Sequence, residues 1–187
     1  MQSLLASIRL VVATMLVCVV GYAAVIWGVG RIITPDTAQG SLITRADGTI
    51  VGSRLIAQNF SEPRYFWPRP STVDYNGAGA GGSNKSPTST DLTDRAKEII
   101  AQYGATAENP LPPELAAASG GGLDPHISEH AALYQVARVA EARGLPLSEV
   151  EGVIREHVFA PGTFLTPDRL VNVLELNLAL DSLPTTQ

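Results

Sequence analysis

Two histidines come closest to a metal site in this sequence. His126 and His130 are four residues apart, with Asp124 and Glu129 beside them. Histidines at positions i and i+4 of a helix can share a metal ion, but Asp124 and His126 precede the expected start of the helix. A catalytic zinc site needs three protein ligands, and the sequence shows no third ligand converging on this pair. We therefore expect no metal site and assign these side chains to capping and surface polarity.

A glycine-rich loop comes near to a phosphate-binding motif but lacks its context. Residues 79–86, GAGGSNKS, fit the pattern G-x-x-x-x-G-K-[ST] except at Asn84, where the second glycine belongs. That motif turns backbone amides toward phosphate at the start of a helix that follows a strand. Here Pro87 follows at once, and no β-rich run leads in. We interpret residues 77–86 as a glycine-rich loop with another purpose.

The common arrangements of a catalytic nucleophile are missing from the sequence. Neither the S-x-x-K pattern nor the G-x-S-x-G elbow occurs. Cys18 is the only cysteine and lies in an apolar run, which excludes it from any soluble site. We expect that the chain is not an enzyme, and an anchored hydrolase is the weakest of the functions considered.

The chain is organised around that apolar run, residues 10–30, which lies between Arg9 and Arg31. About 20 apolar residues in a helix span a bilayer core of roughly 30 Å. A cleaved signal usually has an apolar region of about 7–15 residues and a small-residue cleavage site, whereas Ile32 and Ile33 follow this run. We predict a short tail at residues 1–9 and a retained transmembrane helix in the lipid bilayer.

Flanking charge barely decides which side of the membrane the rest of the chain occupies. The flank before the apolar run has one basic residue, Arg9, and the flank after it has Arg31, with Arg45 further along the chain. A short tail followed by a long domain favours a cytoplasmic amino terminus and one extracytoplasmic domain at residues 31–187. The formal net charge is −5, and Arg9 is the only charged side chain before Arg31, so the remainder carries −6. Nucleic acid is excluded as a partner because its binding takes clustered basic charge.

The remainder alternates strand and helix patterns. Asp47-Gly48 between two β-prone runs predicts a hairpin. Apolar periodicity predicts helices at residues 91–103, capped by Thr90, and at about 129–143. Residues 174–180 fit either a strand or a short helix. The predicted fold is therefore a soluble α/β (α+β) domain on a single N-terminal transmembrane helix.

Three further local features carry predictions. Ser148 and Glu151 have the spacing of a capping box for a helix that ends near His157. Phe66 and Trp67 are expected to fill the core, with a docking surface for a partner as the alternative. The run SGGGLDPHIS, residues 119–128, predicts a turn before the helix that follows.

Four blocks together resemble the KdpC family, the C subunits of Kdp-type potassium-transporting P-type ATPases. The resemblance covers almost the whole chain and departs from the family pattern at Lys85, Ser86 and residues 89–90. The blocks are residues 52–71, ending in YFWPRPS; residues 75–88, with GSN and PT; residues 119–140, with SGGGLDPHIS; and residues 171–181, VNVLELNLALD.

The resemblance implies a non-catalytic accessory subunit of a high-affinity, ATP-driven potassium uptake complex in the bacterial inner (plasma) membrane. Its partners would be a channel-like potassium-translocating subunit, an ATP-hydrolysing P-type subunit and a small membrane peptide. The subunit would stabilise the assembly and assist the ATP-hydrolysing subunit as a catalytic chaperone. No cofactor of its own is implied with certainty; ATP would act through the pump complex.

The alternative implied by the family is a nucleotide-binding regulator that raises ATP affinity by direct contact, with Gln135 as the residue touching ATP. An extracytoplasmic domain cannot meet cytoplasmic ATP, so we assign the motif residues a structural or subunit-docking role. These residues are Ser119, Gly120, Gly122, Asp124, Pro125, His126, Trp67 and Arg69.

Overall fold

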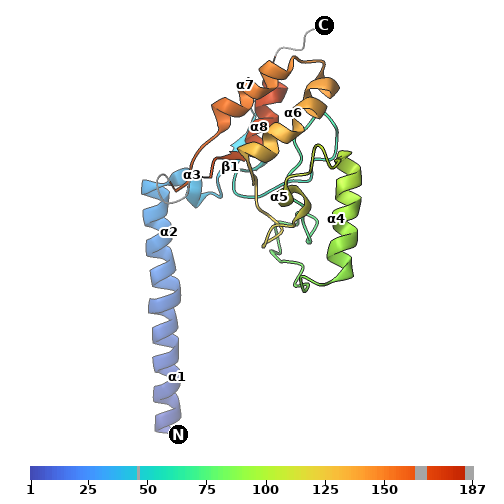
Figure 1. Cartoon of the computed structure of the whole chain (residues 1–187). Coiled ribbons are helices and arrows are strands. Elements are labelled where there is room, and N and C mark those ends of the chain that lie inside the picture. The colour runs from blue at the N-terminus through green and yellow to red at the C-terminus, as the bar shows by residue number, and fades with distance from the viewer. Residues whose placement is uncertain (46, 163–167, 184–187) are drawn as a thin grey trace. The chain divides into compact units, whose positions relative to one another are not determined.

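The structure, a computed structural model, describes residues 1–45, 47–162 and 168–183 (Figure 1). Residues 1–51 and residues 52–187 form two compact units. The predicted class is confirmed, because a long apolar helix at the amino-terminal end is followed by a domain of helices and small sheets. A single domain over residues 31–187 stays a prediction.

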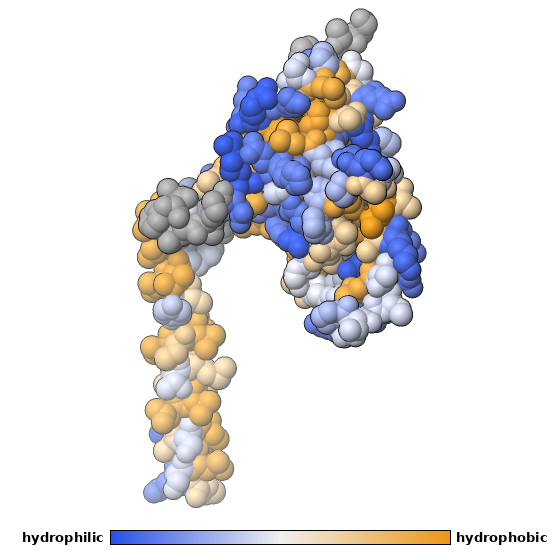
Figure 2. Space-filling model, in the orientation of Figure 1, coloured by the Kyte–Doolittle hydropathy of each residue, from blue (hydrophilic) through white to orange (hydrophobic). Residues whose placement is uncertain are grey.

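One helix dominates the first unit. It consists of α1 (Gln2–Met15), the π-helical η1 (Leu16–Gly21) and α2 (Tyr22–Ile33), and none of its side chains is buried. Most of its surface is orange or pale in Figure 2, as expected for a membrane helix. It extends beyond the predicted residues 10–30 because residues 2–9 contain no helix breaker, and it ends where Pro35 disfavours helical backbone at Thr34.

The predicted hairpin at Asp47 and Gly48 is confirmed. After α3 (Pro35–Ala38), strands β1 (Leu42–Thr44) and β2 (Ile50–Ser53) form a two-stranded sheet. The Arg45 amide donates to the Thr49 carbonyl oxygen at 2.9 Å, and Gly48 has a φ of 83°. Glycine adopts this left-handed backbone without a Cβ clash, so it suits the turn.

Helices α6 (Glu129–Arg143), α7 (Leu147–His157) and α8 (Val173–Ser182) form the centre of the second unit and lie together in Figure 1. Strands β3 (His126–Ser128) and β4 (Leu170–Asn172) pair antiparallel, with Ile127 opposite Val171. The helices α4 (Thr90–Tyr103) and α5 (Pro113–Ala116) complete the unit.

The buried core joins these helices to the small sheet. It contains Phe66, which is fully buried, and Trp67 is nearly so, which confirms that both fill the core. One face of every central helix contributes, as the 3.6-residue periodicity predicted. The core cluster is Phe66, Leu115, Ile127, Ala131, Ala132, Val136, Val139, Ala140, Val150, Val153, Ile154, Val171, Val173, Leu176 and Leu180.

The predicted capping box at Ser148 is wrong. Pro146 is the N-cap of α7, and no side chain caps this end. The fixed φ of proline, here −61°, already sets the chain for helix entry, which moves the start two residues ahead of Ser148. Thr90 likewise does not cap α4 but is its first residue, after Ser89.

The ambiguous run at residues 174–180 is helical. Asn172 ends β4 and caps α8, because its Oδ1 accepts a hydrogen bond from the Glu175 amide at 3.2 Å. A side-chain acceptor at this position satisfies a free amide of the first helical turn. The cap therefore marks where the extended backbone of residues 170–172 changes to helix.

The caps give a direct test of helix entry. Ser128 Oγ accepts from the Ala131 amide at 3.0 Å at the start of α6. We expect Ser128→Ala to lower the free energy of unfolding by about 1–2 kcal/mol, whereas Ser148→Ala changes it by less than about 0.5 kcal/mol. Urea unfolding of the full chain in detergent micelles, followed by circular dichroism, measures both. An equal loss in the two variants would restore the capping box at Ser148.

Candidate functional site

Two buried amide side chains hold the extended residues Phe66 and Trp67 between α6 and α8. Asn177 accepts from the Phe66 amide at 2.8 Å and donates to the Phe66 carbonyl at 3.0 Å. Gln135 does the same for Trp67, at 2.8 and 3.2 Å. The backbone groups of successive extended residues face opposite sides, so the two amides take the places of two neighbouring strands.

Gln135 uses its whole hydrogen-bonding capacity inside the fold. Its Oε1 also accepts from Arg138 Nη2 at 2.6 Å, and its Nε2 also donates to the Ala131 carbonyl at 3.3 Å. A glutamine amide has two donor hydrogens and two acceptor lone pairs, and this residue is 1% exposed. The predicted contact of Gln135 with ATP stays a prediction, and the geometry favours a structural role.

Arg138 completes this arrangement. Its guanidinium lies 3.8 Å from the centre of the Trp67 ring, and its Nη1 donates to the carbonyls of Pro63 and Tyr65 at 2.6 and 2.9 Å. Burial lowers the pKa of Arg138 to about 10, which still leaves it charged at neutral pH. Its charge therefore strengthens the bonds that fix the aromatic run.

Asp124 links the predicted motif to the same extended segment. Its Oδ2 lies 3.2 Å from Arg69 Nη1, and its Oδ1 accepts from the His126 amide at 3.0 Å. Burial alone would raise the pKa of Asp124, but the bonds from His126 and the charge of Arg69 outweigh it and hold the pKa below its usual value. Asp124 is therefore ionised at neutral pH and fixes the turn against Arg69.

The two glycine-rich stretches cross beside this segment. Ser71 Oγ donates to the Gly122 carbonyl at 2.7 Å, and the Gly81 amide donates to the Gly121 carbonyl at 2.9 Å. Thr72 Oγ1 adds a bond to the Gly81 carbonyl at 2.9 Å. The loop 77–86 is therefore bound to the motif at residues 119–122.

The crossing requires glycine at two positions. A Cβ atom on Gly82 would lie 2.8 Å from the Gly120 carbonyl oxygen. Gly122 has a φ of +70°, and a Cβ atom there would lie 2.6 Å from Val73 Cγ2. Gly120 itself is different, because a Cβ atom on it meets nothing within 4 Å. Close approach of neighbouring atoms accounts for glycine at positions 82 and 122.

The remaining motif residues make contacts of their own. The Pro125 carbonyl accepts from the Val173 amide at 2.9 Å, and the Ser119 amide donates to the Pro70 carbonyl at 3.1 Å. His126 packs edge-on against Phe159, with ring centres 5.4 Å apart, while His130 is exposed on α6. Within residues 1–45, 47–162 and 168–183, no three His, Cys, Asp or Glu side chains lie close enough to hold a metal ion.

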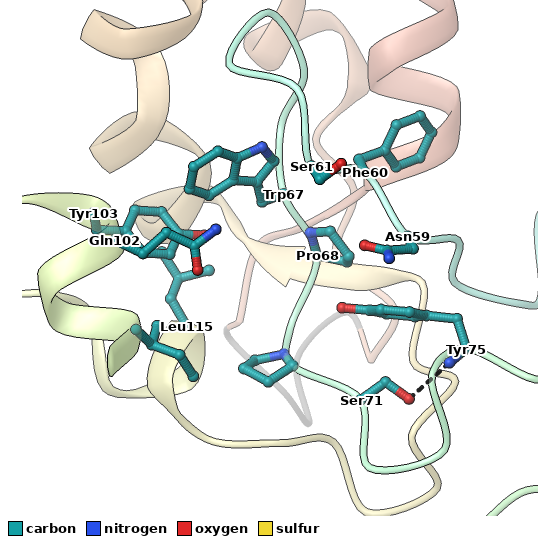
Figure 3. Close-up of a pocket in the computed structure, with 12 residues that line it drawn as sticks. Asn59, Phe60, Ser61, Trp67, Pro68, Ser71, Tyr75, Gln102, Tyr103 and Leu115 are labelled. Atoms are coloured by element: carbon teal, nitrogen blue, oxygen red, sulfur yellow. Dashed lines mark hydrogen bonds between the residues drawn. The ribbon is translucent and has the colours of Figure 1, made fainter. Parts of the chain in front are cut away.

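A cavity of about 230 Å³ opens beside Trp67. Figure 3 shows Gln102 and Tyr103 of α4 on one side, with Pro68 and Tyr75 on the other. The Tyr75 hydroxyl donates to the Arg69 carbonyl at 2.9 Å, and burial raises the pKa of Tyr75 to about 12. The described lining residues carry no formal charge at neutral pH, so the cavity offers no carboxylate or imidazole that could act as a general base.

The structure thus brings part of the predicted set to one segment, residues 66–72, which is contacted by Ser119, Gly122, Asp124 and Gln135. Pro125 instead bonds to Val173, and His126 packs on Phe159.

Asn177 and Arg138 lie in the blocks that resemble the family, but the sequence predicted no role for their side chains, which complete the arrangement. A signal for Asn177 was present, since it is an amide in the otherwise apolar stretch 176–180, on the helix face that Leu176 and Leu180 share with the core. A polar side chain at a core position usually pairs with a buried polar group.

Comparison with known proteins gives one consistent family. The family model described as "KdpC: K+-transporting ATPase, c chain" matches residues 4–182. A protein of Parvibaculum lavamentivorans named "Potassium-transporting ATPase KdpC subunit" is 73% identical over 185 residues, covering 99% of each chain. Proteins with that name from Ralstonia nicotianae and Geobacter sulfurreducens are 48% and 42% identical, covering 95% and 98% of this chain and 90% and 99% of their own.

The close approach of the two glycine-rich stretches can be tested within the run of three glycines at residues 120–122. Gly122→Ala places a side chain in left-handed backbone and against Val73, so we expect the free energy of unfolding to fall by about 2–4 kcal/mol. Gly120→Ala is the matched control and should change it by less than about 1 kcal/mol. Urea unfolding of the full chain measures both. Similar effects of the two substitutions would contradict the crossing described here.

Proposed function

Because this chain belongs to the KdpC family, the c chains of potassium-transporting ATPases, we propose that it serves its pump as a non-catalytic accessory subunit. In this role it stabilises the high-affinity potassium uptake complex and assists ATP hydrolysis by another subunit. The observation that carries the proposal is the fixed segment at residues 66–72. Its backbone is bound by the side chains of Asn177 and Gln135. Arg69 and Ser71 bind the motif at Asp124 and Gly122, so the domain offers a rigid surface to partners.

The partners we propose are a channel-like potassium-translocating subunit, an ATP-hydrolysing P-type subunit and a small membrane peptide. The membrane helix at Gln2–Ile33 keeps the domain beside them. An accessory chain can act without chemistry, because a subunit that binds one pump state more tightly shifts the equilibrium by that difference in affinity. Assembly and coupling then depend on the stability of the domain.

We further propose that the domain lies on the extracytoplasmic side of the bacterial inner membrane. Two observations support this side over the cytoplasm. The Gln135 amide is engaged on every side within the fold. The chain beyond Arg9 carries a net charge of −6, which disfavours an anionic nucleotide. A domain without a nucleotide contact has no need of the ATP-containing compartment.

Cysteine labelling tests the side of the membrane. In a Cys18→Ser background, Ala78→Cys places a thiol on the exposed glycine-rich loop, and Ser3→Cys places one at the other end of the membrane helix. With a membrane-impermeant thiol reagent, we expect Ala78→Cys to label in intact cells and Ser3→Cys only after lysis. The reverse pattern would put the domain in the cytoplasm and make the nucleotide-binding regulator the better explanation.

Substitution of Gln135 distinguishes a structural role of this residue from a contact with nucleotide. We expect Gln135→Ala to lower the free energy of unfolding by about 2–3 kcal/mol, because the Trp67 backbone groups lose their buried partner. The yield of assembled pump should fall, while the KM for ATP of the pump that still assembles stays within about twofold. Gln102→Ala, an exposed amide on α4, is the matched control. A large rise in the KM for ATP with normal assembly would refute the structural role.

A further inference from the structure

Helix α4 packs on its unit without burying a side chain. All its residues are described, and none is buried, whereas α6, α7 and α8 each bury at least three. Its apolar stripe is half-buried at Leu92 and Ile99, and Ile100 is 41% exposed. In Figure 1 this helix, drawn in green, stands beside α5 and apart from α6 to α8. Because buried apolar area supplies most docking free energy, α4 is weakly held.

Pockets that open to solvent border α4 at several points. The cavity of about 230 Å³ separates Tyr103 from Pro68, and another of about 340 Å³ separates Leu92 and Arg95 from Ser71. A third, of about 460 Å³, lies between Ile100 and the chain before α5. These pockets are open to solvent, and where α4 borders them it has no dispersion contacts with the residues opposite. The α4 interface therefore lacks the close packing found around α6 and α8.

Polar groups do not make up for this loss. Arg95 Nε is buried without a hydrogen-bond partner within the described chain, as are the Nε atoms of Arg69 and Arg138, so it adds no bond that would hold α4. At the start of the helix, Lys85 pairs with Asp91 at 2.6 Å, but both side chains are about half exposed or more. Exposed ion pairs restrain little.

Tyr103 is the residue through which α4 reaches the core. Its ring meets Trp67 edge-on at 5.0 Å between ring centres and lies 6.2 Å from Tyr134. Gly104 follows with a φ of +64°, and Pro110, Pro112 and Pro113 continue the chain. The glycine-rich loop precedes α4. The loop is bound at Gly81 and Gly82, so the connection on this side is the chain from residue 83 to residue 89. This connection and the chain from residue 104 to residue 112 can change direction while the elements beyond them keep their structure.

We propose that α4 is a hinged arm, latched by Tyr103 against Trp67 and Tyr134, which opens as a unit while α6, α7 and α8 stay folded. Opening exposes the Trp67 face of the cavity shown in Figure 3. Because the closed form gains little from packing, the open form is populated to a measurable extent.

Hydrogen exchange of the full chain in lipid nanodiscs tests the arm without any substitution. We expect the inner amides of α4 to converge on one opening equilibrium, at least about 100-fold more populated than the opening of α6, with a weaker dependence on urea. Exchange of α4 and α6 through the same opening would overturn the proposal. So would amides of α4 that fray separately from its ends without a common opening.

The latch has its own matched pair of variants. Tyr103→Ala should accelerate exchange of the α4 amides about tenfold, as expected for the loss of aromatic contacts, and leave the α6 amides unchanged. Ile100→Ala, on the same helix but exposed, should alter α4 exchange by less than about twofold. Equal acceleration by the two substitutions would show that Tyr103 is no latch.

Discussion

The need to pair the buried backbone of Phe66 and Trp67 governs the second unit. Among the described residues no strand pairs with these two, and unpaired buried amides and carbonyls would each cost about 1–3 kcal/mol. Asn177 and Gln135 meet that need from two different helices. The amide pair thereby fixes the spacing of α6 and α8 and brings Phe66 into the core that both helices share with β3 and β4.

From this fixed segment the remaining arrangement follows in order. The side chain of Arg69 pairs with Asp124, and that of Ser71 donates to the Gly122 carbonyl, so the glycine-rich motif is bound to the segment at two points. The loop 77–86 then crosses that motif at a distance that only glycine permits. The unusual residues of the sequence therefore form one connected support in the structure.

Local patterns predicted what depends on near neighbours. The helix at residues 129–143 and the hairpin at Asp47-Gly48 were predicted because periodicity and turn chemistry act over a few residues. The pairing of Asn177 with Phe66 joins residues far apart in sequence, and such contacts leave no local pattern. The prediction of a capping box at Ser148 failed for a different, local reason. Pro146, two residues earlier, already has the backbone conformation of a helix N-cap, so α7 begins before Ser148. Arg138 was read as a family residue, and its stacking on Trp67 became visible only in three dimensions.

The length of the membrane helix has a consequence for the bilayer itself. At 1.5 Å per residue the helix from Gln2 to Ile33 is about 48 Å long, whereas Arg9 and Arg31 are about 33 Å apart along it. The latter distance matches a hydrocarbon layer of about 30 Å, and Arg31 lies 5.5 Å from the centre of the Trp27 ring, an anchor typical of the headgroup region. The helix can therefore stand nearly upright with little hydrophobic mismatch, and a thinner bilayer would force it to tilt.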